Sequence, residues 1–176
     1  MPNDHLLNLV SLAGEPVDSY ALYSFRGREA FSEPFEYVIQ VYTDERPDLT
    51  QWIGKLAEFT VAPGSAEPRS FAGRIYGAHA VTHDGRLLIE VRIGPAYLVM
   101  AFERLTHIFQ DMTSLAIFAA TTKDQPGIVT TVSVSPAPPV RGTVGRVDEV
   151  GLDFLARLLS IDGIFYYFTY DRDGGG

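Results

Sequence analysis

Residues 86–93 alternate between apolar and polar side chains, and this alternation constrains the fold more than any other feature of the sequence. The side chains of one parity are apolar and those of the other are mainly charged: Leu87, Ile89, Val91 and Ile93 against Arg86, Glu90 and Arg92. A period of two is typical of a β-strand with one buried face, because successive side chains of a strand point to opposite sides.

The first hundred residues contain further segments of this kind. Residues 35–42 (FEYVIQVY) alternate in the same way, and shorter alternations occur at residues 57–61 and 71–75. Asp84-Gly85 lies between two alternating runs and favours the two-residue turn of a β-hairpin. Several short strands with no long helix between them predict an antiparallel barrel or sandwich, and argue against a doubly wound α/β fold.

One short helical turn is expected among these strands. Asp48 is a favourable N-cap for a turn over residues 48–53. Trp52, the single tryptophan of the chain, lies in this turn. We interpret it as an anchor of the core rather than as a platform for a ligand.

The second part of the chain combines short helices with extended segments. Thr113 is a suitable N-cap for a short helix that ends at residues 123–127 (KDQPG). Residues 128–134 (IVTTVSV) predict a strand. Residues 135–139 (SPAPP) predict a stiff extended connector.

A longer amphipathic helix is expected to begin near Asp148. Its apolar residues recur at helical spacing: Leu152, Phe154, Leu155, Leu158, Leu159 and Ile161. Gly163 follows where a left-handed C-cap residue is favoured. Residues 164–170 (IFYYFTY) are apolar at both parities, which predicts a strand covered on both faces and favours core packing or a subunit interface over a binding stripe.

Composition narrows the classes of function. The 176 residues carry 22 acidic and 14 basic side chains, a formal net charge of −8, and no cysteine. This balance argues against a nucleic-acid binder and against a partner of anionic lipid, since both need a basic patch. The absence of cysteine excludes disulfides, thiolate zinc sites and cysteine nucleophiles. No apolar run is long enough to span a bilayer, and Asp4 stands where a signal peptide would be basic, so a cytoplasmic origin is expected.

The sequence contains no convincing catalytic constellation. His79 and His83 have HxxxH spacing, but on a strand four residues span about 13 Å, which is too far for two ligands of one zinc ion. No G-x-S-x-G elbow and no phosphate-binding glycine loop is present. The carboxylate pairs Asp44-Glu45 and Asp148-Glu149 suit a turn and a helix start. We therefore expect no enzyme activity, no catalytic, cofactor-binding or metal-ligating residue and no cofactor, and the sequence assigns no interface residue.

Four segments in a fixed order resemble one protein family. They are RGREAFSEPFEY (26–37), FAGRIYGAHAVTHDGRLLIEVRIGPAYLVMAFER (71–104), HIFQDMTSLAIFA (107–119) and LDFLARLLSIDGIFYYF (152–168). Together they are similar to the N-terminal region of VgrG, the spike protein of type VI secretion systems, which resembles the central baseplate hub of contractile phage tails. The segment RGTVGRVDEV (141–150) departs from the family pattern.

The resemblance implies a mainly β fold with short helices: an antiparallel barrel of the phage tail hub type and the beginning of a second, similar domain. The implied division is a first hub barrel at 1–104, a connecting segment with a short helix and strand at 105–147, and the helix and first strand of an incomplete second barrel at 148–176. The chain is then expected to be a fragment or a truncated product.

The implied function is structural. A hub of this family adapts the threefold spike to the hexameric tube, so the resemblance implies a homotrimer in the full-length form, an Hcp-like tube protein as a partner, and contacts with baseplate components and effectors. No nucleic acid and no membrane insertion are implied. Assembly in the cytoplasm and secretion through the apparatus without a signal peptide would follow. The alternatives are a phage-derived tail hub protein and a stand-alone adaptor that binds an effector.

Overall fold

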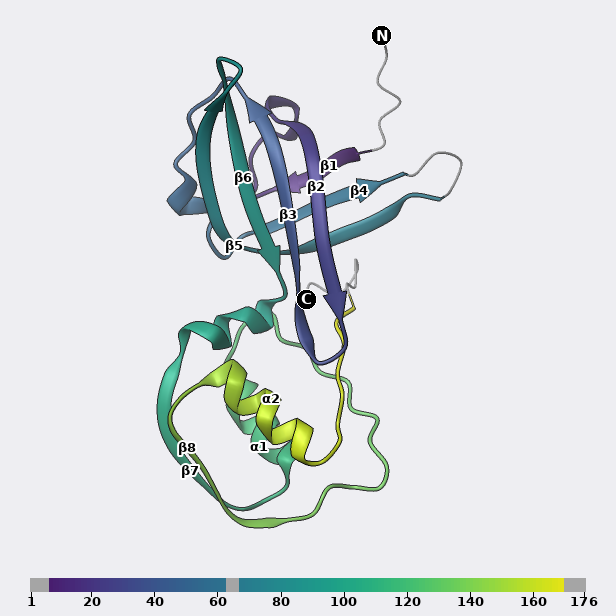
Figure 1. The fold of residues 1–176 in the computed structure, drawn as a ribbon, viewed down its shortest axis with the longest axis vertical. Coiled ribbons are helices and arrows are strands. Elements are labelled where there is room, and N and C mark those ends of the chain that lie inside the picture. Colours follow the sequence, from purple (N-terminus) through teal and green to yellow (C-terminus); the bar gives the residue numbers. More distant parts are fainter. Residues whose placement is uncertain (1–6, 63–66, 170–176) are drawn as a thin grey trace. The chain divides into compact units, whose positions relative to one another are not determined.

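The computed structural model describes residues 7–62 and 67–169. The chain forms two compact units. The first comprises residues 1–29 and 35–95, and the second comprises residues 30–34 and 96–176. Strands dominate the first unit, and the second unit combines a two-stranded ribbon with two helices (Figure 1). The chain is thus mainly antiparallel β with short helices, as predicted.

The first unit is built on a six-stranded sheet that curls into a half-barrel (Figure 1). Its strands follow the order β1-β4-β5-β6-β3-β2. Short 3₁₀ turns connect some of them, at Val17–Ser19 and Leu49–Trp52. The strands are β1 (Leu7–Leu12), β2 (Ala21–Ala30), β3 (Glu33–Thr43), β4 (Leu56–Val61), β5 (Arg69–His83) and β6 (Arg86–Gly94).

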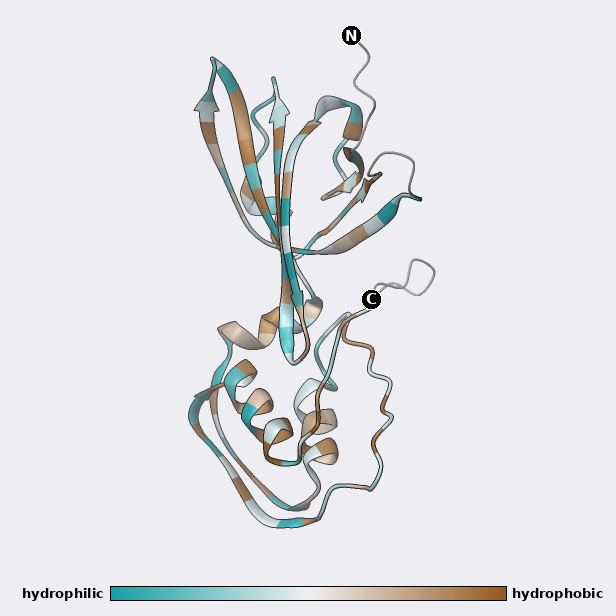
Figure 2. Cartoon of the chain, turned by 45° about the vertical axis from the view of Figure 1, so that its right-hand side comes forward, coloured by the Kyte–Doolittle hydropathy of each residue, from teal (hydrophilic) through white to brown (hydrophobic). Residues whose placement is uncertain are grey.

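The predicted alternation of β6 and the predicted hairpin are confirmed. His83 pairs with Arg86 at the end of the β5–β6 ladder. Asp84 and Gly85 between them have φ angles of 50° and 75°. Positive φ at both central residues is the requirement of a type I′ turn, which Asp-Gly meets at low cost. Figure 2 shows the resulting alternation of hydrophobic and hydrophilic residues along the strands.

The core of the first unit lies on one face of this sheet. The apolar parity of β6 supplies Ile89, Val91 and Ile93, and β3 supplies Ile39 and Val41; all five side chains are fully buried. Registers bring the two sets together, since Ile39 pairs with Val91 and Val41 with Ile89. The period-two pattern therefore predicts the buried face of both strands correctly.

The predicted turn at 48–53 is present as the 3₁₀ turn Leu49–Trp52. The Asp48 carboxylate accepts a hydrogen bond from the Thr50 backbone N–H at 3.1 Å, as an N-cap does. Trp52 is fully buried, and its Nε1 donates to Glu15 Oε1 at 3.0 Å. It is a core anchor, as expected.

The ionisation of the Glu29 carboxylate makes the stability of the first unit depend on pH. Arg69 Nη2 donates to both Glu29 oxygens, at 2.6 and 2.8 Å, and the Tyr37 hydroxyl donates to Oε1 at 2.6 Å. The hydrogen bonds from Arg69 and then Tyr37 lower the pKa of Glu29 below its ordinary 4.5. A depressed carboxyl pKa stabilises the folded state above the unfolded pKa, and this contribution is lost as pH falls through the folded value.

We expect Glu29→Gln to lose stability relative to the parent chain at pH 6, by less than about 1 kcal/mol because the Glu29 side chain is 43% exposed and its ion pair is screened by water. The difference should vanish as the pH falls from about 5 to 3. Thermal unfolding of both chains across this range measures it. Glu67→Gln, at an exposed carboxyl, is the matched control. A difference between parent and Glu29→Gln that stays constant with pH would contradict the assignment.

The second unit packs two helices against a two-stranded ribbon. Its core is formed mainly by the long 3₁₀ segment Ala96–Phe102, the ribbon and both helices, and includes Tyr97, Met100, Phe109, Ile117, Phe154, Leu155 and Leu158. The ribbon pairs β7 (Arg104–Met112) with β8 (Arg141–Val150), and the helices are α1 (Ser114–Thr122) and α2 (Gly151–Ile161).

Local signals located the helices well but not the ribbon. Thr113 caps α1 as predicted, accepting a hydrogen bond from the Ala116 backbone N–H at 3.2 Å. The prediction of a helix start near Asp148 was three residues early, because residues up to Val150 pair with β7. The sequence patterns do not predict the ribbon itself. Its two strands are 28 residues apart in sequence, and β8 contains glycines that weaken the strand signal.

The C-terminal end of α2 follows the prediction. Gly163 has φ 67° and donates its N–H to Ser160 O at 3.1 Å, and the Ile164 N–H donates to Leu159 O at 3.0 Å. These two bonds form a Schellman motif, in which a left-handed glycine satisfies the last free carbonyls of the helix.

Two predicted strands are wrong. Residues 128–134 form no ladder and expose Val129 and Val132. Residues 164–169 are also outside any sheet, and they are not covered on both faces, because Phe165 and Tyr167 are exposed. Tyr170, the last residue of the second predicted strand, lies outside the described residues. In both segments the strand propensity is present, but neither segment forms a ladder with a second strand among the described residues.

Arg146 joins the ribbon to the start of α2. Its side chain is 2% exposed. Nε donates to Glu149 O at 3.0 Å and Nη2 donates to Glu103 O at 2.8 Å. Gly151 fits beside it because it lacks a Cβ, which would lie 2.9 Å from Met100 O. The buried Arg146 guanidinium thus occupies the junction between β8 and α2, a place where an apolar side chain would ordinarily pack.

Candidate interaction surfaces

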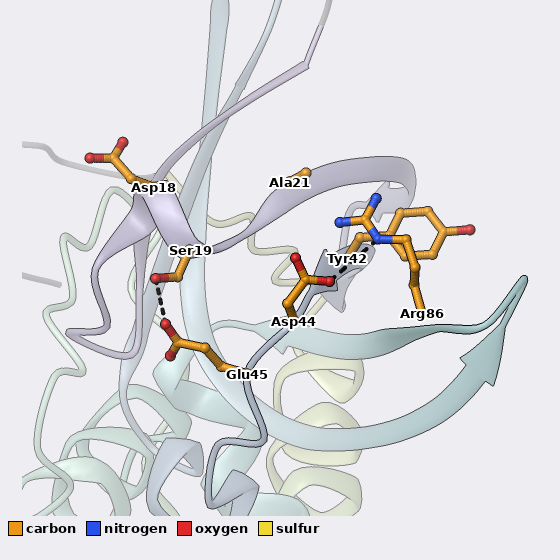
Figure 3. A pocket seen from close by; sticks show the side chains of 7 residues that line it. All are labelled: Asp18, Ser19, Ala21, Tyr42, Asp44, Glu45 and Arg86. Carbon is orange, nitrogen blue, oxygen red and sulfur yellow. Dashed lines mark hydrogen bonds and ion pairs between the residues drawn. The ribbon is translucent and has the colours of Figure 1, made fainter.

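The first unit contains a pocket, which we call the hollow (Figure 3). It has a volume of about 250 Å³ and is lined by Asp18, Ser19, Ala21, Tyr42, Asp44, Glu45 and Arg86. Ser19 Oγ donates to Glu45 Oε1 at 2.8 Å, and Arg86 Nε lies 3.6 Å from Asp44 Oδ1. The Arg86 guanidinium also lies over the Tyr42 ring. Asp44, Glu45 and Arg86 thus have partners within the hollow.

The hollow has none of the geometry of a hydrolytic site. The Ser19 hydroxyl donates a hydrogen bond to the Glu45 carboxylate, and no histidine lines the pocket among the described residues. Nucleophilic catalysis by serine needs an oriented base together with donors for the oxyanion. The pair Asp44-Glu45 is thus divided between an arginine and a hydroxyl, consistent with the turn role expected from sequence.

The two histidines of the HxxxH motif lie on β5, so the strand geometry assumed for them is confirmed. Both are exposed. His83 Nδ1 is hydrogen-bonded to the Tyr42 hydroxyl, and its ring lies 6.3 Å from that of Tyr23. Within residues 7–62 and 67–169, no group of three His, Asp or Glu side chains could hold a metal ion.

The second carboxylate pair supports the start of α2. Glu149 accepts hydrogen bonds from Arg157 Nε and Nη2 at 2.9 and 2.7 Å. The bonds from Arg157 lower the pKa of the Glu149 carboxyl. Arg104 Nη1 donates to the backbone oxygen of Asp148. Each group therefore has a structural partner.

None of the helices in the described part of the chain has the length and apolarity that crossing a bilayer requires.

The outer face of the ribbon exposes single apolar side chains among polar ones. Phe109 and Val144 pair with each other and point into the core, whereas Ile108, on the opposite face, is 61% exposed. Val147 is 69% exposed at the irregular end of the ladder. Among the described residues, neither ribbon strand pairs with a third strand, so both edges remain open. Open edges of this length are sites where further chains can add.

A second exposed surface is formed by three aromatic side chains, Phe31, Phe165 and Tyr167, which we call the aromatic patch. They are 68%, 66% and 65% exposed. The Phe31 ring centroid lies 5.6 Å from that of Phe165 and 6.1 Å from that of Tyr167, and both pairs are nearly perpendicular. Adjoining aromatic rings with this exposure mark an interaction surface more often than an ordinary solvent-facing one.

The segment that carries the patch is anchored through its other face. Tyr166 and Phe168 pack against Tyr97, with ring centroids 5.8 and 5.7 Å apart. Burial raises the pKa of both Tyr97 and Tyr166. From the sequence, residues 165–168 are a single apolar run. The structure divides the run into an inner pair, Tyr166 and Phe168, and an outer pair, Phe165 and Tyr167.

Comparison with known proteins gives a consistent result. The family described as phage tail baseplate hub (GPD) matches residues 28–176. Eleven chains of solved structures match the fold. One is the Escherichia coli c3393 protein, described as a component of the type VI secretion system with structural similarity to the T4 bacteriophage tail proteins gp27 and gp5. The TM-score is 0.74 at 24% identity. The match covers 94% of this chain and 45% of that one, so the chain spans less than half of that relative. No curated protein matches significantly.

Proposed function

The chain belongs to the phage tail baseplate hub (GPD) family, and from this premise we propose that it is a structural hub subunit of a type VI secretion spike. Family membership over residues 28–176 is the observation that carries the hub role. The fold shared with a solved type VI secretion component supports the assignment of that hub to a type VI spike. The role is that of a scaffold whose surfaces, rather than a reactive centre, perform the function.

The proposed assembly is a homotrimer of the full-length protein that adapts a threefold spike to a hexameric, Hcp-like tube. Its further partners would be baseplate components and effectors. The protein would assemble in the cytoplasm and leave through the apparatus itself. Residues 1–104 would form the first hub domain, residues 105–147 a connecting segment, and residues 148–176 the start of a second domain.

A second candidate is a tail hub of a phage or of a phage-derived particle. The description of the matching family favours it directly. The two candidates share a physical role and differ in the tube that the hub contacts. The identity of that tube therefore distinguishes them.

We expect the purified chain to bind the hexameric ring of a type VI tube protein and not a phage tail tube protein. Binding can be measured by interferometry with each ring immobilised, using an unrelated hexamer of similar charge as the control. Ile108→Glu tests the ribbon as the contact surface, and Val81→Glu is its control at an exposed site of the first unit. Binding only to the phage tube would favour the second candidate, and binding to neither ring would contradict both.

A further inference from the structure

Residues 7–62 and 67–169 contain two Asp-Gly pairs, and the fold holds them differently. Asp84-Gly85 forms the turn between β5 and β6, and Asp162-Gly163 follows the last residue of α2. A third pair, Asp173-Gly174, lies outside the described residues. An aspartate before glycine is prone to cyclise, because glycine has no side chain to hinder attack by its amide nitrogen. The structure around each pair therefore decides how readily it reacts.

Asp84-Gly85 is open to solvent. Residues 79–86 are all exposed, and the Asp84 side chain is 87% exposed. Its carboxylate lies 3.7 Å from His83 Nδ1. In a two-residue turn the ladder bonds belong to the flanking pair, here His83 and Arg86, so the Gly85 N–H is left free. A hairpin tip that ends on one exposed residue pair opens at a lower free energy than a buried element does.

Asp162-Gly163 has the same sequence, but both reacting groups are held. The Asp162 side chain is 8% exposed, and its Oδ1 accepts a hydrogen bond from Arg141 Nη2 at 2.5 Å. The Gly163 N–H, whose nitrogen would have to attack, donates to Ser160 O at 3.1 Å. Cyclisation at this pair therefore requires the C-terminal end of α2 to unfold locally.

We propose that Asp84-Gly85 is a site of spontaneous backbone isomerisation and that the fold protects Asp162-Gly163 from the same reaction. The Gly85 amide nitrogen attacks Asp84 Cγ, and the new N–Cγ bond closes a succinimide ring. One carboxylate oxygen leaves as water, with the amide proton and a proton from solvent. Water then opens the ring. Addition at the α-carbonyl carbon of Asp84 breaks its bond to nitrogen and gives an isoaspartyl link, whereas addition at Cγ restores aspartate.

The isoaspartyl product changes the hairpin that carries it. The main chain then runs through the side-chain methylene of Asp84, so it gains one carbon atom between His83 and Arg86. A two-residue turn no longer fits the pairing of these two residues. Arg86 lines the hollow, and its guanidinium lies over the Tyr42 ring, so the change extends to the hollow. This inference does not rest on the proposed function.

Incubation of the folded 176-residue chain at neutral pH, followed by tryptic peptide mapping, tests the proposal. Cleavage at arginine gives peptide 75–86, which contains Asp84, and peptide 158–172, which contains Asp162. The isoaspartyl form has an unchanged mass, elutes separately and is located by electron-transfer fragmentation. A digest of chain that was not incubated gives the background. We expect isomerisation to be at least about tenfold faster at Asp84 than at Asp162.

The same chain unfolded in guanidinium is the matched control. Both Asp-Gly pairs are then open to solvent, and they should isomerise at similar rates. Asp84→Gly removes the reacting carboxylate but keeps a sequence that suits the turn, so its peptide 75–86 should remain a single species. Four results would each overturn the inference: equal rates at the two sites in the folded chain, a faster reaction at Asp162, an unchanged peptide 75–86 over a time in which the unfolded chain reacts, or a second species in Asp84→Gly.

Discussion

Trp52→Ala is expected to lower the free energy of unfolding by about 3–5 kcal/mol, the range for removing a fully buried large aromatic side chain. The Trp52 side chain is 0% exposed and meets the Tyr20 ring edge-on at 5.6 Å. The substitution leaves a cavity in the core of the first unit. It also leaves Glu15 without the indole N–H that bonds its carboxylate at 3.0 Å.

The matched control for this prediction is the next residue in the chain. Ile53 is 52% exposed, so Ile53→Ala should cost less than about 1 kcal/mol. Urea unfolding should be followed by circular dichroism, because Trp52 is the single tryptophan and its removal abolishes the fluorescence signal. Equal effects of the two substitutions would show that Trp52 is not the anchor of this core.

Arg146→Met is expected to lower the free energy of unfolding by about 2 kcal/mol, because methionine retains much of the aliphatic stem but none of the donors. The Glu149 backbone oxygen then loses its bond from Arg146 Nε, and a buried acceptor without a partner costs about 1–3 kcal/mol. The Glu103 backbone oxygen loses the bond from Nη2 but keeps the one from the Gly151 N–H at 2.9 Å, so its loss costs less. The ion pair with Glu103 Oε2, at 3.4 Å, contributes less, because that carboxylate is partly solvated.

Arg157 provides an unusually close control for Arg146. Both guanidinium groups lie over the Phe154 ring, at 5.9 and 5.5 Å from its centroid. Arg146 is 2% exposed, however, and Arg157 is 46% exposed. Arg157→Met should therefore cost less than about 1 kcal/mol despite its shorter bonds to Glu149. If Arg157→Met proved the more damaging of the two by urea unfolding, burial would not be what makes Arg146 important.

The interaction surfaces were less accessible to sequence reasoning than the strands and caps. Four apolar residues in sequence, Phe165 to Phe168, carry no information about which of them faces solvent. Phe31 is 134 positions away from Phe165, and only folding brings the two rings together. The alternating exposure of 165–168 follows from the packing of Tyr97 against Tyr166 and Phe168.

The sequence by itself determined the features that depend on neighbours in the chain. Local sterics and hydrogen bonds set four such features: the parity of residues 86–93, the turn at Asp84-Gly85, the cap at Thr113 and the left-handed Gly163. The tertiary structure decided which extended segments become strands. Residues 128–134 and 164–169 have strand propensity and remain unpaired, while the glycine-containing residues 141–150 pair with β7 and hold Arg146 in the core. The reason is that a ladder needs a second strand, and contacts distant in sequence determine where one lies.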